Sequence, residues 1–481
     1  MEFLSSFPAP ASPKRIAVIG VGPAGLAALK AISDAPNFKA GIWTVTAFEP
    51  REQVGGVWNP APPTDDPPLT PLYDSLTTNI PHPIMAYTSF SFPPSTLLFP
   101  PAHIVQNYLV AFSDHFDLRQ YVQFNTRVTN LWWDGLCWKL VTDQQAQPED
   151  FDFVVVSNGH YRKPYYPPVP GLQSWIDAKK ISHSSWYRRP SDLGQVVLVV
   201  GAGPSGHDIS EEIQSTAQTV IRSMTGAPPN TEGKIKIRGR VNEFLPDGQV
   251  RFEDGLVEGG IDFCILATGY EMSFPFMSPS ELIPDFPPPC PPLPSHLYNS
   301  TFSVFPLAKH VFPVQKDYPP STIAFLGLPI RVAPFPAMEA QAQAALRVFA
   351  HPEALNLTEE SVDIITHYET VGKRIPGSPV THRDIIKNYH KFTDREQFDY
   401  RDQLYEFASR EEGGPAPMKV PGWIIEAYEE KGPLRRIWQQ IVRDGKGEET
   451  VKGVGEGGIH EWEDLIGKLL DRSRTEERSR L

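Results

Sequence analysis

The sequence contains only three cysteines, Cys137, Cys264 and Cys290, and no two of them form a C-x-x-C pair. This scarcity is typical of a reducing compartment, and it disfavours a disulfide framework, a thiol–disulfide redox centre and a cysteine zinc site. Histidines such as His382 and His390 are too isolated to give metal-ligand spacing. We therefore expect no bound metal.

The sequence also lacks an excess of positive charge, since 57 acidic residues outnumber 44 lysines and arginines and leave a formal net charge of −13. Nucleic-acid binding depends on clustered basic residues, so we expect no nucleic-acid partner. No apolar run reaches the roughly 18 residues that a membrane span requires. We expect a soluble protein with no membrane span.

A strand, a glycine-rich turn and a helix follow one another near the N-terminus. An apolar run at residues 15–19 predicts a buried parallel strand, residues 26–32 have a helical pattern, and a second strand is expected at residues 42–48. The G-x-G-x-x-G spacing after the first strand permits a tight turn, close approach of a pyrophosphate and close packing of helix on strand. The acid after the second strand can accept hydrogen bonds from ribose hydroxyls. This unit predicts a dinucleotide site made of Gly20, Val21, Gly22, Pro23, Ala24, Gly25 and Glu49.

A second unit of the same kind begins with a strand expected at residues 195–200 and ends with one at residues 219–222. Its last strand ends in Arg222 rather than in an acid. A guanidinium favours the 2′-phosphate of NADP, whereas a carboxylate would repel it. Lys234 and Arg238 are alternative phosphate partners, and Arg222 could instead be a solvated strand end. The predicted NADP site comprises Gly201, Gly203, Ser205, Gly206 and Arg222.

Two dinucleotide sites in one chain indicate a path for electrons. NADPH would deliver hydride to the other nucleotide, for which FAD fits best. A disulfide reductase would need a redox cysteine pair, which this sequence lacks. Transfer of the electrons to O2 or to another acceptor is the remaining route. The alternative to a dinucleotide site is an ordinary glycine turn in an α/β protein. The alternative to transfer of oxygen is a flavoprotein that only oxidises NADPH or serves as a binding partner.

Several further segments follow a known pattern in the same order along the chain. Residues 55–58 form a G-G-x-W segment, and residues 73–79 end in Thr-Asn. The other matching segments are residues 90–93, 158–161, 267–270, 325–329 and 334–336, the last with Gln341. Together these motifs resemble the flavin-containing monooxygenases, the class B single-component group, over residues 14–350.

The resemblance implies an enzyme that uses FAD, NADPH and O2. Through a flavin C4a-hydroperoxide it would oxygenate a soft nucleophilic nitrogen or sulfur atom of a small organic molecule. By the same resemblance Asn79 is the catalytic residue, because its amide can donate to oxygen atoms in a dry site. A loop-capping role is the alternative for Asn79, and core packing is the alternative for Trp58 and Val128. Further cofactor contacts are implied for Val57, Trp58, Thr78, Val128, Thr268 and Gly269.

One motif of this family is kept only in part. The family pattern is F-x-G-x-x-x-H-x-x-x-[FY], and this sequence keeps His183 and Tyr187 but has Asp177 and Lys179 at the first two positions. The resemblance implies that His183 and Tyr187 set the geometry of an interdomain linker. Related Baeyer–Villiger enzymes prefer Trp where this chain has Tyr187, so oxygenation of a heteroatom is favoured, with a ketone oxygenase as the alternative.

These patterns predict an α/β fold with two Rossmann-like dinucleotide-binding domains, the NADP domain inserted into the FAD domain, and a helical C-terminal region. Residues 132–141 are expected to form one strand, and residues 337–350 the last core helix. The expected domain limits are residues 1–165 and 276–350 for the two parts of the FAD domain, 166–275 for the NADP domain and 351–481 for the helical extension.

The last three residues, Ser479, Arg480 and Leu481, resemble the peroxisomal address S-K-L with arginine in place of lysine. A peroxisomal import receptor is therefore a possible partner, besides a small-molecule substrate and O2. A charged helix tail that happens to end this way is the alternative. We expect a cytoplasmic or peroxisomal protein.

Overall fold

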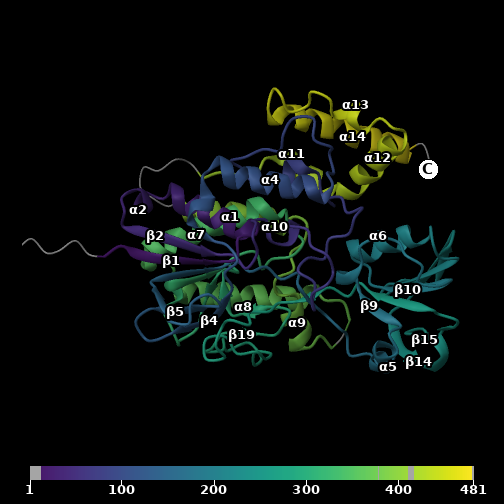
Figure 1. The fold of residues 1–481 in the computed structure, drawn as a ribbon, viewed down its shortest axis with the longest axis horizontal. Helices are drawn as coiled ribbons and strands as arrows, with labels where there is room; N and C mark the ends of the chain where they lie inside the picture. The colour runs from purple at the N-terminus through teal and green to yellow at the C-terminus, as the bar shows by residue number, and fades with distance from the viewer. Residues whose placement is uncertain (1–11, 378, 410–416, 479–481) are drawn as a thin grey trace, which may run out of the picture.

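The two largest sheets of the described chain lie apart, the first towards the left of Figure 1 and the second towards the right. The computed structural model describes residues 12–377, 379–409 and 417–478, so Ser479, Arg480 and Leu481 lie outside the described residues. The first sheet has the strand order β23-β7-β1-β2-β3, and all its strands are parallel. Its strands are β1 (Lys14–Ile19), β2 (Trp43–Phe48), β3 (Val122–Gln123), β7 (Phe153–Val156) and β23 (Ile323–Phe325).

The two faces of the first sheet are covered by different layers. In β1, Ile16 and Val18 face one hydrophobic cluster, whereas Ala17 and Ile19 face another. This alternation explains why the strand is apolar throughout, since both of its faces are buried. Helices α1 (Pro23–Asp34), α7 (Pro334–Ala350) and α10 (Glu396–Ala408) build the first layer. The second layer contains β4 (Val128–Trp133), β5 (Trp138–Thr142) and β6 (Glu149–Phe151).

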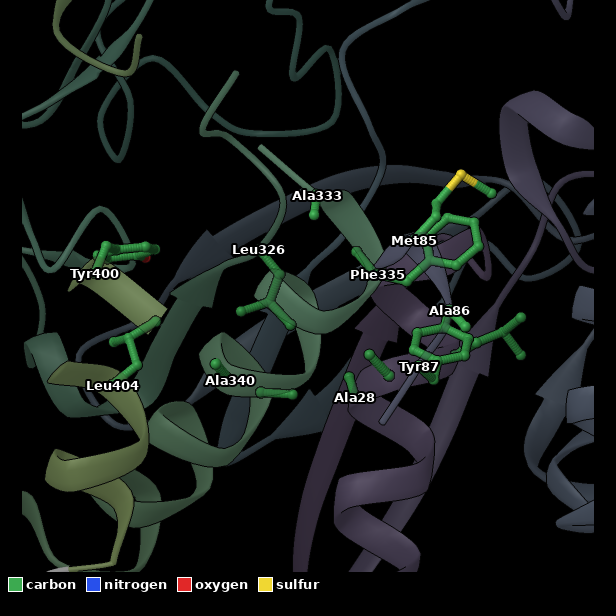
Figure 2. Packing of buried hydrophobic residues seen from close by; sticks show 14 of the residues in the cluster. Ala28, Met85, Ala86, Tyr87, Leu326, Ala333, Phe335, Ala340, Tyr400 and Leu404 are labelled. Carbon is green, nitrogen blue, oxygen red and sulfur yellow. The ribbon is translucent and has the colours of Figure 1, made fainter. Parts of the chain in front are cut away.

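The packing of α1 against α7 depends on small residues and flat rings (Figure 2). Ala28 of α1 and Ala340 of α7 are both buried, and alanines let two helix backbones approach closely. The rings of Tyr87 and Phe335 stack beside them with centroids 5.1 Å apart. Tyr87 also donates a hydrogen bond to the carbonyl oxygen of Pro23 at 2.6 Å, which ties the segment after Asn79 to the first turn of α1.

The second sheet has the strand order β12-β13-β11-β10-β17-β9, and only β12 runs antiparallel. Its strands are β9 (Ile181–His183), β10 (Val196–Val200), β11 (Thr219–Ser223), β12 (Asn230–Glu232), β13 (Ile235–Arg238) and β17 (Phe263–Leu266). In sequence, all of them lie between β7 and β23 of the first sheet. This arrangement confirms the predicted fold class with one nucleotide unit inserted into the other, while the domain limits by number stay a prediction.

The expected single strand at residues 132–141 was wrong, because β4 and β5 form a hairpin there. The chain turns at Asp134, whose Oδ1 accepts the N–H groups of Leu136 and Cys137 at 2.8 and 2.9 Å. Gly135 lies in the left-handed region with φ of 101°. The aromatic residues on both sides of this turn gave one continuous apolar signal, which concealed the break.

The remaining elements are short strands, 3-10 turns and α-helices of 4 to 20 residues. The strands are β8 (Lys163–Pro164), β14 (Val241–Leu245), β15 (Gln249–Phe252), β16 (Val257–Glu258), β18 (Tyr270–Glu271), β19 (Tyr298–Asn299), β20 (Val304–Phe305), β21 (Leu307–Ala308) and β22 (Phe312–Pro313). The α-helices are α2 (Pro36–Lys39), α3 (His82–Met85), α4 (Ala102–His115), α5 (Leu172–Asp177), α6 (Pro204–Ile213), α8 (Leu357–Arg374), α9 (His382–Asn388), α11 (Gly422–Glu429), α12 (Lys431–Arg443), α13 (Gly447–Val451) and α14 (Ile459–Arg478). Figure 1 shows α12 to α14 above α4, with α12 directed towards α6.

Candidate functional site

The first glycine-rich turn lies at the carboxyl end of β1. Gly20 has φ of 92°, and a Cβ atom there would lie 2.9 Å from the carbonyl oxygen of Ser157, at the end of the neighbouring strand β7. A Cβ atom at Gly25 would overlap the carbonyl oxygen of Gly20. Only glycine therefore permits both the turn and the close packing of α1 on the sheet.

The first turn of α1 presents free hydrogen-bond donors. Among the residues that the structure describes, no acceptor is present for the N–H groups of Ala24 and Gly25. The helix also has no side-chain cap at Gly22. A helix N-terminus with open N–H groups binds anions such as a pyrophosphate, so these residues fit the nucleotide that the sequence predicts.

The G-G-x-W segment closes over this turn. The N–H of Gly55 donates to the carbonyl oxygen of Val21 at 3.0 Å, and a Cβ atom at Gly56 would lie 2.8 Å from the Cα atom of Gly22. The carbonyl oxygen of Val57 accepts a hydrogen bond from Thr70. Trp58 is half-buried and lines an open groove of about 730 Å³, whose walls include Pro60, Pro62, Leu72 and Tyr73.

Glu49 lies at the end of β2, beside the same turn. Its carboxylate accepts the N–H groups of Val21 at 2.9 Å and Arg51 at 3.1 Å. Burial raises the pKa of Glu49, and the two backbone N–H groups oppose this shift. The N–H of Thr126 donates to the Glu49 carbonyl at 3.0 Å, so the segment leading to Val128 also reaches this end of the sheet.

Thr78 and Asn79 differ sharply in their surroundings. Thr78 is buried, and its Oγ1 donates to the carbonyl oxygen of Ile80 at 2.8 Å. Asn79 is exposed, and no residue in the described part of the chain hydrogen-bonds its side chain. The side-chain amide of Asn79 therefore has no hydrogen-bond partner in the described part of the chain, where no capping contact is seen. The catalytic role of Asn79 stays a prediction.

The second glycine-rich turn repeats the first at the end of β10. Gly201 has φ of 136°, and Cβ atoms at Gly201 and Gly206 would overlap the carbonyl oxygens of Ala267 and Gly201. A Cβ atom at Gly203, by contrast, would meet nothing within 4 Å. The N–H groups of Ser205 and Gly206 lack an acceptor among the described residues. The second turn therefore fits a second nucleotide in the same way as the first turn fits the first nucleotide.

Thr268 and Gly269 lie at a crossing between the two sheets. Thr268 Oγ1 donates to the carbonyl oxygen of Tyr165 at 2.5 Å, and the Gly269 carbonyl accepts the N–H of Tyr165 at 2.9 Å. His183 Nε2 donates to the same Gly269 carbonyl at 3.0 Å, while its Nδ1 accepts the N–H of Ser185. Burial lowers the pKa of His183 to about 4, so the ring is neutral at pH 7.

Arg222 is directed towards α6 rather than into solvent. Its Nη1 lies 3.0 Å from His207 Nδ1 and 3.6 Å from Glu211 Oε1, and its side chain is mostly buried. The alternative phosphate partners are also engaged within the chain: Lys234 Nζ donates to two backbone carbonyls, and Arg238 pairs with Glu258. Arg222 is therefore not a solvated strand end, and its contact with a phosphate stays a prediction.

The sequence analysis did not single out His160, which follows the end of β7. Both ring nitrogens are buried and have no hydrogen-bond partner among the described residues, although the backbone of Gly327 lies beside the ring. Burial lowers the pKa of His160 to about 4. Gly327 in turn lies close to Ala24 in the first turn of α1. His160 is thus an additional polar group near the first nucleotide site, and its place in the matching segment 158–161, at a strand end, is the signal that could have indicated it.

Within residues 12–377, 379–409 and 417–478, no group of three or more His, Cys, Asp or Glu side chains could hold a metal ion. In the same part of the chain, no helix is both long and apolar enough to cross a membrane.

A family model and several known proteins match this sequence over most of its length. The sequence model of the family described as flavin-binding monooxygenase-like matches residues 13–228 and 229–395. The chain is 32% identical over 372 residues to the thiol-specific monooxygenase of Saccharomyces cerevisiae, covering 75% of this chain and 82% of that protein. It is 29% identical over 456 residues to flavin-containing monooxygenase FMO GS-OX5 of Arabidopsis thaliana, covering 86% and 94%.

A solved structure shares the fold over nearly the whole chain. The S-allyl-L-cysteine S-oxygenase of Allium sativum superposes with a TM-score of 0.72, at 24% sequence identity, over 96% of this chain and 99% of that chain. Tmm from Pelagibacter sp. strain HTCC7211 gives a TM-score of 0.67 at 21% identity, over 89% and 91%. The helical C-terminal region is thus included in the shared fold.

Proposed function

This chain belongs to the flavin-binding monooxygenase-like family, and we propose that it oxygenates the sulfur atom of a small thiol or sulfide. It is a flavin monooxygenase whose cofactors are FAD and NADPH. The observation that carries the sulfur assignment is the 32% identity to a thiol-specific monooxygenase across 75% of the chain. A nitrogen nucleophile is the nearest alternative, because both atoms are soft nucleophiles.

We assign the two cofactors to the two glycine-rich turns. The open N–H groups of α1 would hold the FAD pyrophosphate, and Glu49 would accept from its ribose. The open N–H groups of α6 would hold NADPH. When bound, NADPH supplies two electrons to the flavin, which then activates O2. The chain's own part is to bind both cofactors, orient them and exclude water.

Asn79 is the residue that we assign to the reacting oxygen. Its side-chain amide is a neutral donor with no partner in the described chain, so it can donate without first breaking another hydrogen bond. The groove beside Trp58 is open enough to admit a small organic molecule. The three cysteines are free and dispersed, which leaves no pair to receive the electrons instead.

The proposed reaction is tested with the purified FAD-loaded protein, NADPH and air. We expect a thiol or sulfide to gain one oxygen atom for each NADPH consumed, with water as the other product. Mass spectrometry of the product and a peroxide assay measure both. Oxygen insertion into a ketone but not into a sulfide would favour the Baeyer–Villiger alternative. Stoichiometric hydrogen peroxide with every substrate would contradict oxygenation.

Arg222 is the residue that we assign to the 2′-phosphate of NADPH. Replacing Arg222 with Gln should raise the KM for NADPH about tenfold and leave the KM for NADH nearly unchanged, because only NADPH carries the extra phosphate. Lys234→Gln is the matched control and should change neither value. An unaltered ratio of the two KM values in the Arg222 variant would remove this assignment.

A further inference from the structure

The C-terminal helices are anchored firmly on the first nucleotide unit. Trp462 of α14 packs edge-on against the ring of His82, with centroids 4.4 Å apart. The N–H of Ser95 donates to the carbonyl oxygen of Val454 at 2.9 Å, and the N–H of Gly453 donates back to Ser95 Oγ at 2.9 Å. These contacts lie just after Asn79 in the sequence, so the C-terminal helices support the segment that carries it.

The same helical region reaches the second nucleotide unit. Arg435 of α12 places Nη2 3.3 and 3.4 Å from the two carboxylate oxygens of Asp208 in α6. Both side chains are mostly buried, with 19% and 17% exposure. An ion pair sheltered to this degree is screened less by salt than one on the open surface. The pair therefore connects α12 to the helix whose first turn is assigned to the second nucleotide.

A third group completes this contact. Tyr73 donates its hydroxyl to Asp208 Oδ2 at 2.7 Å, and its side chain is almost fully buried. Burial and the carboxylate of Asp208 both raise the pKa of Tyr73, so the phenol stays protonated and remains a donor. Tyr73, Asp208 and Arg435 come from three different parts of the chain. The carboxylate of Asp208 binds both of the other side chains.

We propose that Arg435 is a positioning residue of the second nucleotide site. By holding Asp208, it keeps α6 in a fixed relation to the first unit, so that the N–H groups of Ser205 and Gly206 meet the cofactor in the orientation needed for hydride delivery. Small errors in such an orientation have large effects on rate and affinity. This proposal rests on the assignment of NADPH to the second glycine-rich turn.

The test measures NADP⁺ binding to the FAD-loaded protein by calorimetry, without turnover. Arg435→Met should weaken NADP⁺ binding about tenfold and leave the FAD content unchanged, and Arg435→Lys should restore most of the affinity. Asp208→Asn should also weaken binding, and the double variant should be no worse than the poorer single variant, since both substitutions break the same Arg435–Asp208 ion pair.

Arg474→Met is the matched control. Arg474 pairs with Glu426 at 2.6 Å inside the same helical region and touches neither nucleotide unit's glycine-rich turn, so NADP⁺ binding should equal that of the parent. Parental affinity in Arg435→Met, an equal loss in Arg474→Met, or additive losses in the double variant would each overturn the proposal. If the parent itself does not bind NADP⁺, it is the cofactor assignment that fails.

Discussion

Replacing Gly203 with Val should raise the KM for NADPH by about a hundredfold or more while the protein keeps its FAD, because the pyrophosphate can no longer approach α6. A Cβ atom at Gly203 meets no protein atom within 4 Å, and the backbone there is extended with φ of −75° and ψ of 177°. Valine therefore costs the folded protein little. The added Cβ atom enters open space at the helix N-terminus.

Steady-state kinetics with NADPH, the FAD absorbance and the thermal unfolding midpoint together check this result. Gly422→Val at the first residue of α11 is the matched control, since a Cβ atom there also meets open space, and all three measurements should be unchanged. A Gly203 variant with parental KM for NADPH would show that the second turn does not hold this cofactor. Loss of FAD together with NADPH would point to misfolding instead, which contradicts the expectation that valine is tolerated.

Replacing Asn79 with Ala should leave both cofactors bound and reduce the oxygenated product per NADPH about a hundredfold, by loss of one hydrogen-bond donor at the reacting oxygen. NADPH consumption should continue, with hydrogen peroxide released in place of the product. The reason is structural: the Asn79 side chain is exposed and has no hydrogen-bond partner in the described chain, so removing it disturbs no packing.

Simultaneous assays of NADPH, peroxide and product separate this effect from a general loss of activity. Asn130→Ala is the matched control, because Asn130 is also exposed and its side chain makes no hydrogen bond among the described residues. Its product yield should equal that of the parent. If Asn79→Ala gives as much product per NADPH as the parent, the residue has no part in oxygenation.

The strands that carry the two turns could be predicted because burial on both faces imposes continuous apolar runs. Residues 15–19 and 195–200 correspond closely to β1 and β10, and the helical pattern expected at residues 26–32 lies within α1. Glycine spacing placed the turns themselves, since a Cβ atom at Gly25 or Gly206 would overlap the backbone. These elements depend on local sequence, which is why the sequence sufficed.

Other features depend on contacts between distant segments. The direction of Arg222 is set by the packing of α6, which supplies His207 and Glu211, and a strand-end position alone does not indicate it. Tyr73 and Arg435 meet Asp208 across 135 and 227 residues of sequence. No periodicity or motif relates such positions, so these contacts could be found only in the three-dimensional structure.

The discontinuous course of the first sheet also has a consequence for biosynthesis. Strand β7 pairs on one side with β1 but on the other with β23, which begins at Ile323. The second sheet, by contrast, is complete once Leu266 has been translated. On the ribosome, the later-starting sheet therefore has all of its strands while the earlier one still lacks β23, so that β7 is its edge strand. A nascent chain paused between these points would expose that edge, where exposed strands invite aggregation.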